Sequence, residues 1–407
     1  MKIKKLLVII ISIIIFPSTV YALDFPKTNS KIVEIYDLTD NKVLYEINSN
    51  KLTSIASLTK IMTTITAIEN IKNIDEEVII TKDMLKEVSN DASRAGLKVG
   101  DKLTYKDLLY ASILPSGADA TISIAINSCK KIENFVDKMN ALAKKINLKN
   151  THFVNVTGLD EKNHYSTASD VRILLTYALK NKLFKEIYTT KKYKLSNGLI
   201  VKSTLYKYNT SLDTMNKILG SKTGFTNDAG YSLSSLSNIN NHEIIIITLK
   251  AEHINNNYYN IIDTSNLINF LHKNYKDEIL VKKDQLIKTI KVNLSNINTY
   301  DIKATKDIKK YLPSDFNKND LKIEYDGIKE LSYNNKKNST IGTIKYYYKD
   351  ELFFKEDVIL NKKISLNIIK LLKRYIFFIV IFIILITFVI IKIIKNKKRY
   401  KCIKKME

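Results

Sequence analysis

An uncharged apolar run from Tyr375 to Ile391 constrains this chain more than any other feature. As a helix, the run is long enough to cross the roughly 30 Å hydrocarbon core of a bilayer. A helix buried in a protein core is the alternative, but such a helix is rarely so uniformly apolar and is not followed by a cluster of lysines. Because basic segments stay on the cytoplasmic side, the sequence predicts a transmembrane helix over 375–394 and a basic cytoplasmic tail over 395–407.

The opposite end of the chain predicts a signal peptide over residues 1–22. Lysines precede the apolar stretch Leu6–Phe16, and Ala22 is a small residue suited to cleavage. An uncleaved anchor helix is the alternative, but the stretch is short for spanning a bilayer. One end therefore exports the chain and the other stops its transfer. We expect a single-pass protein of the cell membrane whose body lies outside the cytoplasm, on the cell-wall side.

Composition limits the partners. The chain has 407 residues and a net charge of +24, but its basic residues are spread evenly and no nucleic-acid motif accompanies them. We therefore expect no nucleic-acid partner, whereas an anionic surface of lipid headgroups or wall polymers fits the charge. Cys129 and Cys402 fall on opposite sides of the predicted membrane, so no disulfide is expected. The histidines lack metal-ligand spacing, and we expect no metal.

The exported part changes character near residue 276. Before that point, the apolar periodicity predicts the following elements: a β-hairpin over 31–47, a helix starting near Ser57, a largely helical stretch to about 185, strands Gly230–Ser237 and Glu243–Lys250, and a helix Asp263–Leu271. From about 278, short alternating runs separated by turn residues indicate a small all-β domain. We expect an α/β domain over 23–275, a β-rich domain over 276–365 and a linker over 366–374.

Three short boxes carry the chemistry. They are Ser57-Leu58-Thr59-Lys60, Ser116-Gly117-Ala118 and Lys222-Thr223-Gly224. Residues three apart share one face of a helix, so the amine of Lys60 can reach the hydroxyl of Ser57. A hydroxyl becomes a nucleophile when a base removes its proton, and a lysine acts as that base when desolvation or a nearby cation lowers its pKa. Lys222 is the candidate cation, and the helix N-terminus adds positive potential.

A bare Ser-x-x-Lys is weak, because the chain has another one at Ser128–Lys131. With their flanks Ile55–Thr63 and Gly220–Gly230, and in this order, the boxes resemble the active site of penicillin-binding proteins and serine β-lactamases. The fuller match is similar to the low-molecular-mass D-alanyl-D-alanine carboxypeptidases and covers roughly residues 30–348. It implies a penicillin-recognising serine transferase/β-lactamase-like α/β fold followed by a small all-β domain. Asn150–Leu159 and His164–Asp170 also resemble that family, as segments that shape the cleft wall.

The resemblance assigns roles to seven residues. The catalytic set is Ser57 as nucleophile, Lys60 as base and Ser116 as proton relay to the leaving amine. The substrate-binding set is Lys222, Thr223, Gly224 and Phe225. A charge and a hydroxyl in that strand suit a carboxylate, and a glycine lets the substrate backbone approach closely. The backbone N–H groups of Ser57 and Phe225 would form the oxyanion hole. No cofactor is needed.

The chain departs from the family's pattern at two places. Ala118 stands where the family usually has asparagine, which removes a polar contact to the substrate and to Lys60. This loss bears on turnover more than on acylation. Near the expected strand end lie Lys250, Glu252 and His253, and no arginine for the substrate carboxylate is evident.

The resemblance therefore implies a serine-type D-Ala-D-Ala carboxypeptidase. It would remove the terminal D-alanine from peptidoglycan pentapeptide stems through an acyl-enzyme at Ser57, and β-lactams would inhibit it covalently. A DD-transpeptidase or endopeptidase on the same substrate is one alternative. A weakly catalytic penicillin-binding or sensory wall protein, marked by Ala118, is another. A secreted β-lactamase fits less well, because the surroundings of Glu161 do not match a deacylating glutamate and the chain carries an extra domain and an anchor.

Overall fold

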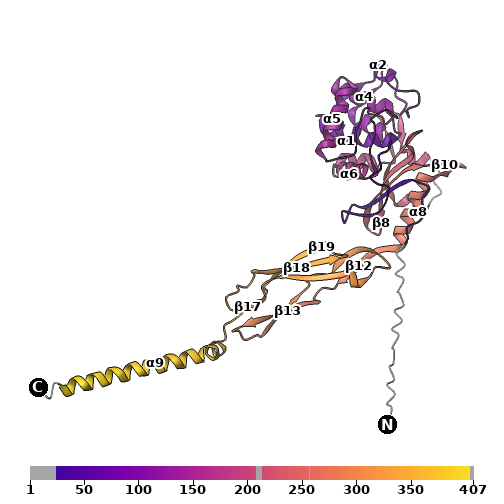
Figure 1. The fold of residues 1–407 in the computed structure, drawn as a ribbon. Helices are drawn as coiled ribbons and strands as arrows, with labels where there is room; N and C mark the ends of the chain where they lie inside the picture. Colours follow the sequence, from indigo (N-terminus) through magenta and orange to yellow (C-terminus); the bar gives the residue numbers. More distant parts are fainter. Residues whose placement is uncertain (1–23, 208–212, 256, 404–407) are drawn as a thin grey trace, which may run out of the picture. The chain divides into compact units, whose positions relative to one another are not determined.

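The computed structural model describes residues 24–207, 213–255 and 257–403, so the predicted signal peptide lies outside the described residues. The chain divides into two compact units (Figure 1). The first is Met1–Lys276 with Pro313–Asp315, and the second is Asp277–Leu312 with Phe316–Glu407.

A five-stranded antiparallel sheet in the order β2-β1-β9-β8-β7 organises the first unit. Its strands are β1 (Ile32–Asp37), β2 (Lys42–Ile47), β7 (Ile218–Thr226), β8 (Gly230–Ile239) and β9 (His242–Ala251). The predicted hairpin over 31–47 is confirmed as β1 and β2. The run Ile244–Ile247 is fully buried in β9, the central strand, as its β-branched composition predicts.

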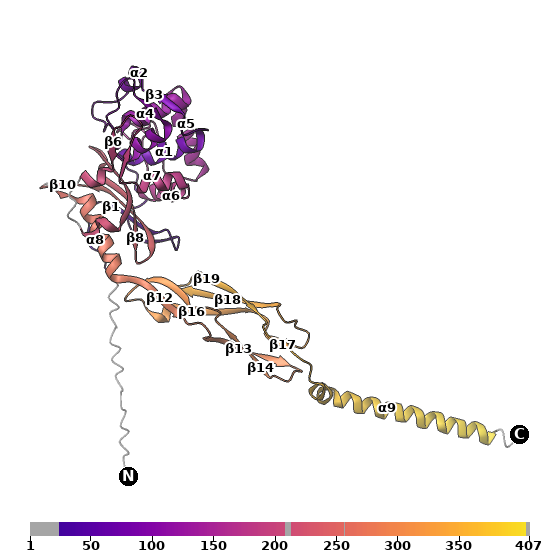
Figure 2. The same cartoon turned by 180° about the vertical axis from the view of Figure 1, so that it is seen from behind.

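Helices cover both faces of this sheet. Ile245 and Ile247 join the core that contains buried residues of the helices between residues 59 and 189. On the other face, Thr248 Oγ1 donates a hydrogen bond of 3.1 Å to the Asn260 carbonyl of α8. Figure 2 shows α8 and α6 on opposite sides of β1 and β8. The longer helices are α1 (Thr59–Asn70), α3 (Tyr105–Ile113), α4 (Ala118–Cys129), α5 (Ile132–Lys145), α6 (Ala168–Ala178), α7 (Lys182–Thr189) and α8 (Tyr259–Asn274).

Short elements connect this framework. They are η1 (Ala56–Leu58), β3 (Glu77–Ile79), α2 (Lys82–Lys86), β4 (Lys102–Thr104), β5 (Lys192–Lys194), β6 (Ile200–Lys202), η2 (Thr204–Lys207), η3 (Asp213–Lys217), β10 (His253–Ile254) and β11 (Asn257–Tyr258). Local sequence sets the helix starts: Thr104 and Asp107 form a capping box at α3, which satisfies N–H groups that have no partner within the helix. The predicted helix near Ser57 begins as the single 3-10 turn η1 and becomes α-helical at Thr59.

The second unit is built from strands up to its last helix. The bounds are β12 (Tyr275–Val281), β13 (Leu286–Asn293), β14 (Thr299–Lys303), β15 (Ile308–Pro313), η4 (Lys318–Asp320), β16 (Leu321–Gly327), β17 (Glu330–Ser332), β18 (Thr340–Tyr348) and β19 (Glu351–Ile359). Three-stranded sheets β14-β13-β17 and β16-β18-β19 enclose a core that includes Ile290, Leu331 and Ile344. The prediction of a small all-β domain is confirmed.

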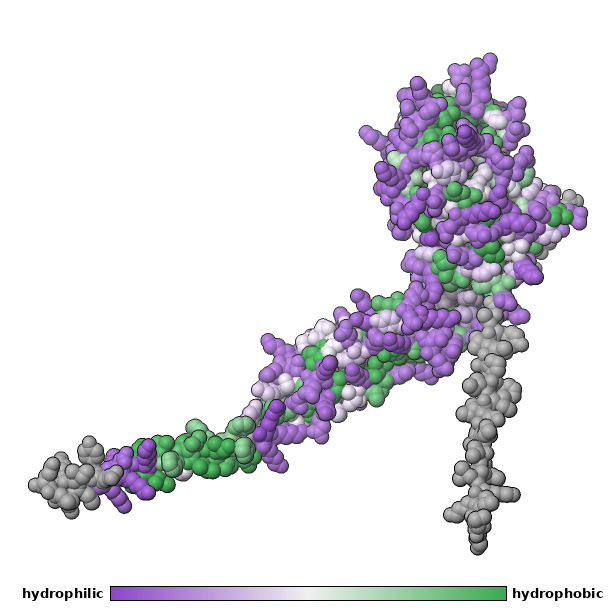
Figure 3. Space-filling model, viewed as in Figure 1, coloured by the Kyte–Doolittle hydropathy of each residue, from purple (hydrophilic) through white to green (hydrophobic). Residues whose placement is uncertain are grey.

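The last helix, α9, runs from Ile368 to Ile403. It begins inside the stretch 366–374 for which the sequence predicts a linker, because Asn367 Oδ1 accepts a hydrogen bond from the Lys370 N–H at 3.0 Å and caps the first turn. Its apolar side chains are exposed, with Phe377 at 68%, and they form a continuous green surface in Figure 3. By length and composition, the helix can cross a membrane.

Candidate active site

Ser57 and Lys60 meet at the junction of η1 and α1. The Lys60 Nζ lies 2.8 Å from the Ser57 Oγ, so the contact predicted from their spacing is present. The same amine donates a 2.7 Å hydrogen bond to the Thr157 carbonyl. Ala56, directly before the serine, has a left-handed backbone with φ of 46°. A non-glycine residue in that region indicates strain held by its surroundings.

Burial lowers the pKa of the Lys60 ammonium group to near neutral pH. The side chain is only 1% exposed, and desolvation lowers its pKa from 10.5 to about 7, although the negative charge of Asp119 acts in the opposite direction. About half of the Lys60 amines are therefore neutral near pH 7, a state in which the amine can accept a proton from a hydroxyl.

A second lysine–serine pair lies beside the first. Lys222 on β7 is fully buried, and its Nζ donates hydrogen bonds to Ser116 Oγ at 2.8 Å and to the Thr223 carbonyl at 2.7 Å. Burial, and to a smaller extent the charge of Lys60, lowers the Lys222 pKa well below its usual value. Ser116 has a φ of 63°, so its backbone is also held in the left-handed region.

Strand β7 passes so close to Ser57 that a side chain at position 224 would press against its neighbours. A Cβ there would lie 3.0 Å from the Ser57 nitrogen and 3.0 Å from the Ala56 Cβ. The next residue, Phe225, is 52% exposed, and its ring lies 4.4 Å from that of Tyr231. The backbones of residues 57 and 225 therefore border the same narrow space.

These groups open into one cleft of about 220 Å³. It is lined by Ser57, Asp91, Ser93, Ser116, Thr204, Thr223, Gly224, Phe225, Tyr231, Tyr258 and Asn260. Five of the predicted site residues are in this lining, and Lys60 and Lys222 contact it through hydrogen bonds from behind. No arginine is among the lining residues of the described chain. Thr204 Oγ1 lies 2.5 Å from Thr223 Oγ1 and extends the hydroxyl wall beyond the predicted box.

A loop after α5 positions Lys60. The Asn155 Oδ1 accepts hydrogen bonds from the N–H groups of Thr157 at 3.2 Å and Gly158 at 2.8 Å, which directs the Thr157 carbonyl to the lysine. Gly158 has a φ of +86°, and a Cβ there would lie 1.9 Å from the Ala56 carbonyl oxygen. The tight fit fixes the strained residue that precedes Ser57.

His164 fastens the same loop to α1. Its Nδ1 accepts a hydrogen bond from the Val154 N–H at 3.3 Å, and its Nε2 lies 2.8 Å from Thr59 Oγ1. This pattern requires a neutral ring that donates through Nε2. Burial lowers the His164 pKa to about 4, which is consistent with that state. Residues of the two family-like stretches therefore support the loop beside Ser57.

The neighbourhood of Ala118 explains how the site is held without an asparagine there. Ala118 is fully buried at the start of α4, and its N–H donates to the Ser93 carbonyl at 2.8 Å. The next residue, Asp119, accepts hydrogen bonds from the backbone N–H groups of residues 95, 96 and 97. These contacts hold the loop that carries Ser93 against Ser116, and Lys60 finds its polar partner in Thr157 instead.

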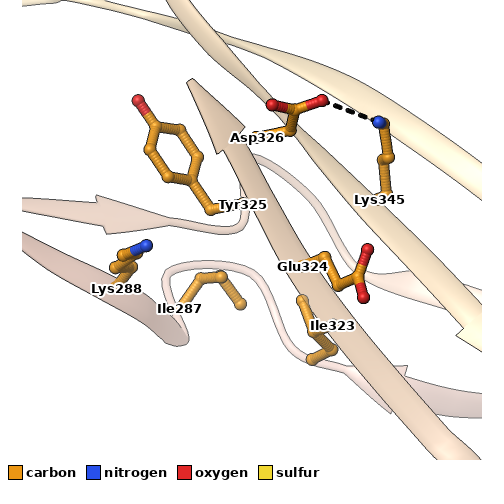
Figure 4. A pocket seen from close by; sticks show the side chains of 7 residues that line it. All are labelled: Ile287, Lys288, Ile323, Glu324, Tyr325, Asp326 and Lys345. Atoms are coloured by element: carbon orange, nitrogen blue, oxygen red, sulfur yellow. Dashed lines mark hydrogen bonds and ion pairs between the residues drawn. The ribbon is translucent and has the colours of Figure 1, made fainter. Parts of the chain in front are cut away.

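A hollow in the second unit has a different character (Figure 4). Lys345 pairs with Asp326 at 2.8 Å across it, and the Lys288 Nζ lies 5.4 Å from the centre of the Tyr325 ring. Elsewhere in the described chain, Asp37, Asp40 and His242 come close enough to share a cation, but His242 Nδ1 already pairs with Asp37 Oδ2 at 2.7 Å. None of these residues lines the cleft at Ser57.

The fold and the paired Ser–Lys contacts define a serine enzyme of the penicillin-recognising class. Penicillin binding protein 5 from Haemophilus influenzae shares the fold, with a TM-score of 0.61 at 22% identity over 84% of this chain and 100% of that one. The sequence model of the D-alanyl-D-alanine carboxypeptidase family matches residues 20–253. This chain belongs to that family and is a serine peptidase.

Two relatives illustrate the range of the family. D-alanyl-D-alanine carboxypeptidase DacF of Bacillus subtilis is 29% identical over 307 residues, which cover 74% of this chain and 77% of the relative. A D-alanyl-D-alanine endopeptidase of Pseudomonas aeruginosa is 33% identical over 220 residues, which cover 53% of this chain and 70% of the relative.

Proposed function

We propose that this protein is a D-Ala-D-Ala carboxypeptidase in which Ser57 attacks the bond between the two terminal D-alanines of a peptidoglycan stem peptide. The observation that carries the proposal is the 2.8 Å contact between Ser57 Oγ and a buried lysine amine. That amine has a pKa of about 7 and can therefore act as a base at neutral pH.

The reaction has two steps. In the first, the neutral Lys60 amine takes the Ser57 proton, and the Ser57 oxygen bonds to the carbonyl carbon of the penultimate D-alanine. The backbone N–H groups of Ser57 and Phe225 stabilise the oxyanion. The C–N bond then breaks, and Ser116, hydrogen-bonded to Lys222 at 2.8 Å, relays to the departing D-alanine the proton that Lys60 took from Ser57. In the second step, water adds to the carbonyl carbon of the ester, and one of its protons passes to the Ser57 oxygen as the ester bond breaks.

The leaving D-alanine carries a carboxylate. Thr223 and Thr204 present hydroxyl groups at one wall of the cleft, and Lys222 supplies positive potential from behind them. Penicillins combine a similar carboxylate with a reactive amide, so they would acylate Ser57 and remain bound.

Endopeptidase action on cross-linked stems is the second candidate, because the Pseudomonas relative bears that name. The acyl step would be identical, and the leaving amine would belong to a neighbouring peptide. A peptidoglycan fragment with one cross-link, incubated beside a linear pentapeptide, separates the two activities by which product accumulates.

We further propose that α9 anchors the protein in the cell membrane as a single pass, with the catalytic unit on the wall side. The apolar length of α9 and the lysines that follow its apolar run support this orientation. Under this proposal, residues 1–22 are the signal peptide, 23–275 the catalytic domain, 276–365 the β-rich domain, 375–394 the membrane span and 395–407 the cytoplasmic tail.

The test is the release of free D-alanine from a pentapeptide ending in D-Ala-D-Ala, using the full-length protein in detergent. We expect release by the unaltered protein and none by the Ser57→Ala variant. If the variant releases D-alanine at the same rate, the proposed mechanism is wrong.

A further inference from the structure

Asp91 is distinct from every other residue that lines the cleft. Within the described chain, it is the one lining residue with a formal charge. The remaining walls consist of hydroxyl groups, aromatic rings, an amide and a glycine. The two lysines of the site are buried behind these walls. Lys60 is hydrogen-bonded to Ser57, and Lys222 is hydrogen-bonded to Ser116. A substrate in the cleft therefore meets a single exposed anionic group.

The loop that carries Asp91 is fixed in place. Ala92 N–H donates to the Ser89 carbonyl at 3.2 Å, and Arg94 donates to the Val88 carbonyl at 2.8 Å. On the other side of Asp91, the Ser93 carbonyl accepts the Ala118 N–H at 2.8 Å. Asp91 is therefore held next to the Ser116 segment by both flanks.

These bonds leave the Asp91 side chain available. The Arg94 guanidinium is directed to backbone carbonyls, and among residues 24–207, 213–255 and 257–403 no cation or N–H group engages the Asp91 carboxylate. The side chain is exposed, so holding it in the cleft costs little desolvation. An ionised carboxylate beside bound peptide attracts an ammonium group and repels a second carboxylate.

We propose that Asp91 is a specificity-determining residue that binds the ammonium group of a basic side chain in the peptide substrate, on the acyl side of the cleaved bond. The side of the bond follows from the reaction: the leaving D-alanine carries a carboxylate and no free amine until the bond is broken. Any cation of the intact substrate therefore lies N-terminal to that bond. This inference rests on the proposed carboxypeptidase activity and adds to it a preference for a cation N-terminal to the cleaved bond.

The probes are two tripeptides that differ in one charge. Nα-acetyl-L-Lys-D-Ala-D-Ala retains the side-chain ammonium, and Nα,Nε-diacetyl-L-Lys-D-Ala-D-Ala lacks it. The readout is the ratio of their kcat/KM values for D-alanine release, measured with the full-length protein in detergent at low ionic strength. We expect the ammonium peptide to be favoured about two- to fivefold, the range of a partly exposed ion pair. Added salt should move the ratio towards one.

Two variants test whether Asp91 causes the preference for the ammonium peptide. Asp91→Asn should move the ratio to about one, and it should do so mainly by lowering kcat/KM for the ammonium peptide. Asp137→Asn removes the same charge from the exposed surface of α5 and should retain the unaltered ratio. Equal release from both peptides by the unaltered protein, or an equal loss on both in Asp91→Asn, would overturn the inference while the proposed function stands. No release from either peptide would overturn both.

Discussion

The pH dependence of Ser57 acylation tests the state of Lys60. With a pKa of about 7, the neutral fraction of the amine is roughly 9% at pH 6 and roughly 91% at pH 8. We therefore expect the acylation rate to rise about tenfold over that interval and to level off above it. A solvated lysine with a pKa near 10.5 would be neutral in only about 0.03% of molecules at pH 7, and its rate would still be rising above pH 9.

The assay is stopped-flow or quenched labelling by a fluorescent penicillin, whose own charge does not change between pH 6 and 9. The Asp119→Asn variant supplies a directional check, because the Asp119 charge raises the Lys60 pKa and its removal should move the inflection to lower pH. Thermal melts at each pH show whether a slower rate comes from unfolding or from protonation of the Lys60 amine. A rate that is flat from pH 6 to 8, or an inflection above pH 9, would refute the role of burial in preparing Lys60.

Three other predictions address separate parts of the structure. Gly158→Ala should lower penicillin labelling at least tenfold and reduce the melting temperature, because its Cβ would lie 1.9 Å from the Ala56 carbonyl; unchanged labelling would contradict the close packing described for this loop. His164, with its pKa lowered from 6.5 to about 4, is neutral in the fold but protonated in the unfolded chain between those values. The free energy of unfolding should therefore fall as pH decreases from 6.5 to 4, by up to about 3 kcal/mol, and a His164→Gln variant measured by urea denaturation should lack this component. Deletion of residues from Ile368 onward should move the expressed protein from the membrane to the soluble fraction, whereas persistent sedimentation with membranes would exclude α9 as the anchor.

Local sequence predicted those parts of the site that depend on fixed spacing. Ser57 and Lys60 are one helical turn apart, so their contact needs only the helix to form. Gly224 was assigned from its box and from the close approach of a substrate backbone that a glycine allows, whereas its closeness to Ala56 and Ser57 is seen only in the structure. The hairpin β1–β2 and the buried β9 followed from alternation and from the four isoleucines, because few structures other than a central strand bury such a run.

The remaining features of the site depend on tertiary contacts, which leave no recognisable pattern in the sequence. The partner of Lys60 is the Thr157 carbonyl, and a backbone oxygen is the same in every sequence. Thr204 and Asp91 enter the cleft from loops whose path is set by distant packing. The sequence placed His164 only in a segment that shapes the cleft wall, and its contact with Thr59 depends on the tertiary fold. The early start of α9 at Ile368 depends on the Asn367 cap, a single-residue signal that apolar periodicity does not include.

Identification of the residue that penicillin modifies shows whether Ser57 is the nucleophile. The full-length protein is incubated with penicillin, digested and mapped by mass spectrometry. We expect one penicilloyl group on the peptide that contains Ser57, and none on the Ser57→Ala variant. A modified Ser128, which begins the chain's other Ser-x-x-Lys, or a protein that stays unmodified at pH 8, would contradict this expectation.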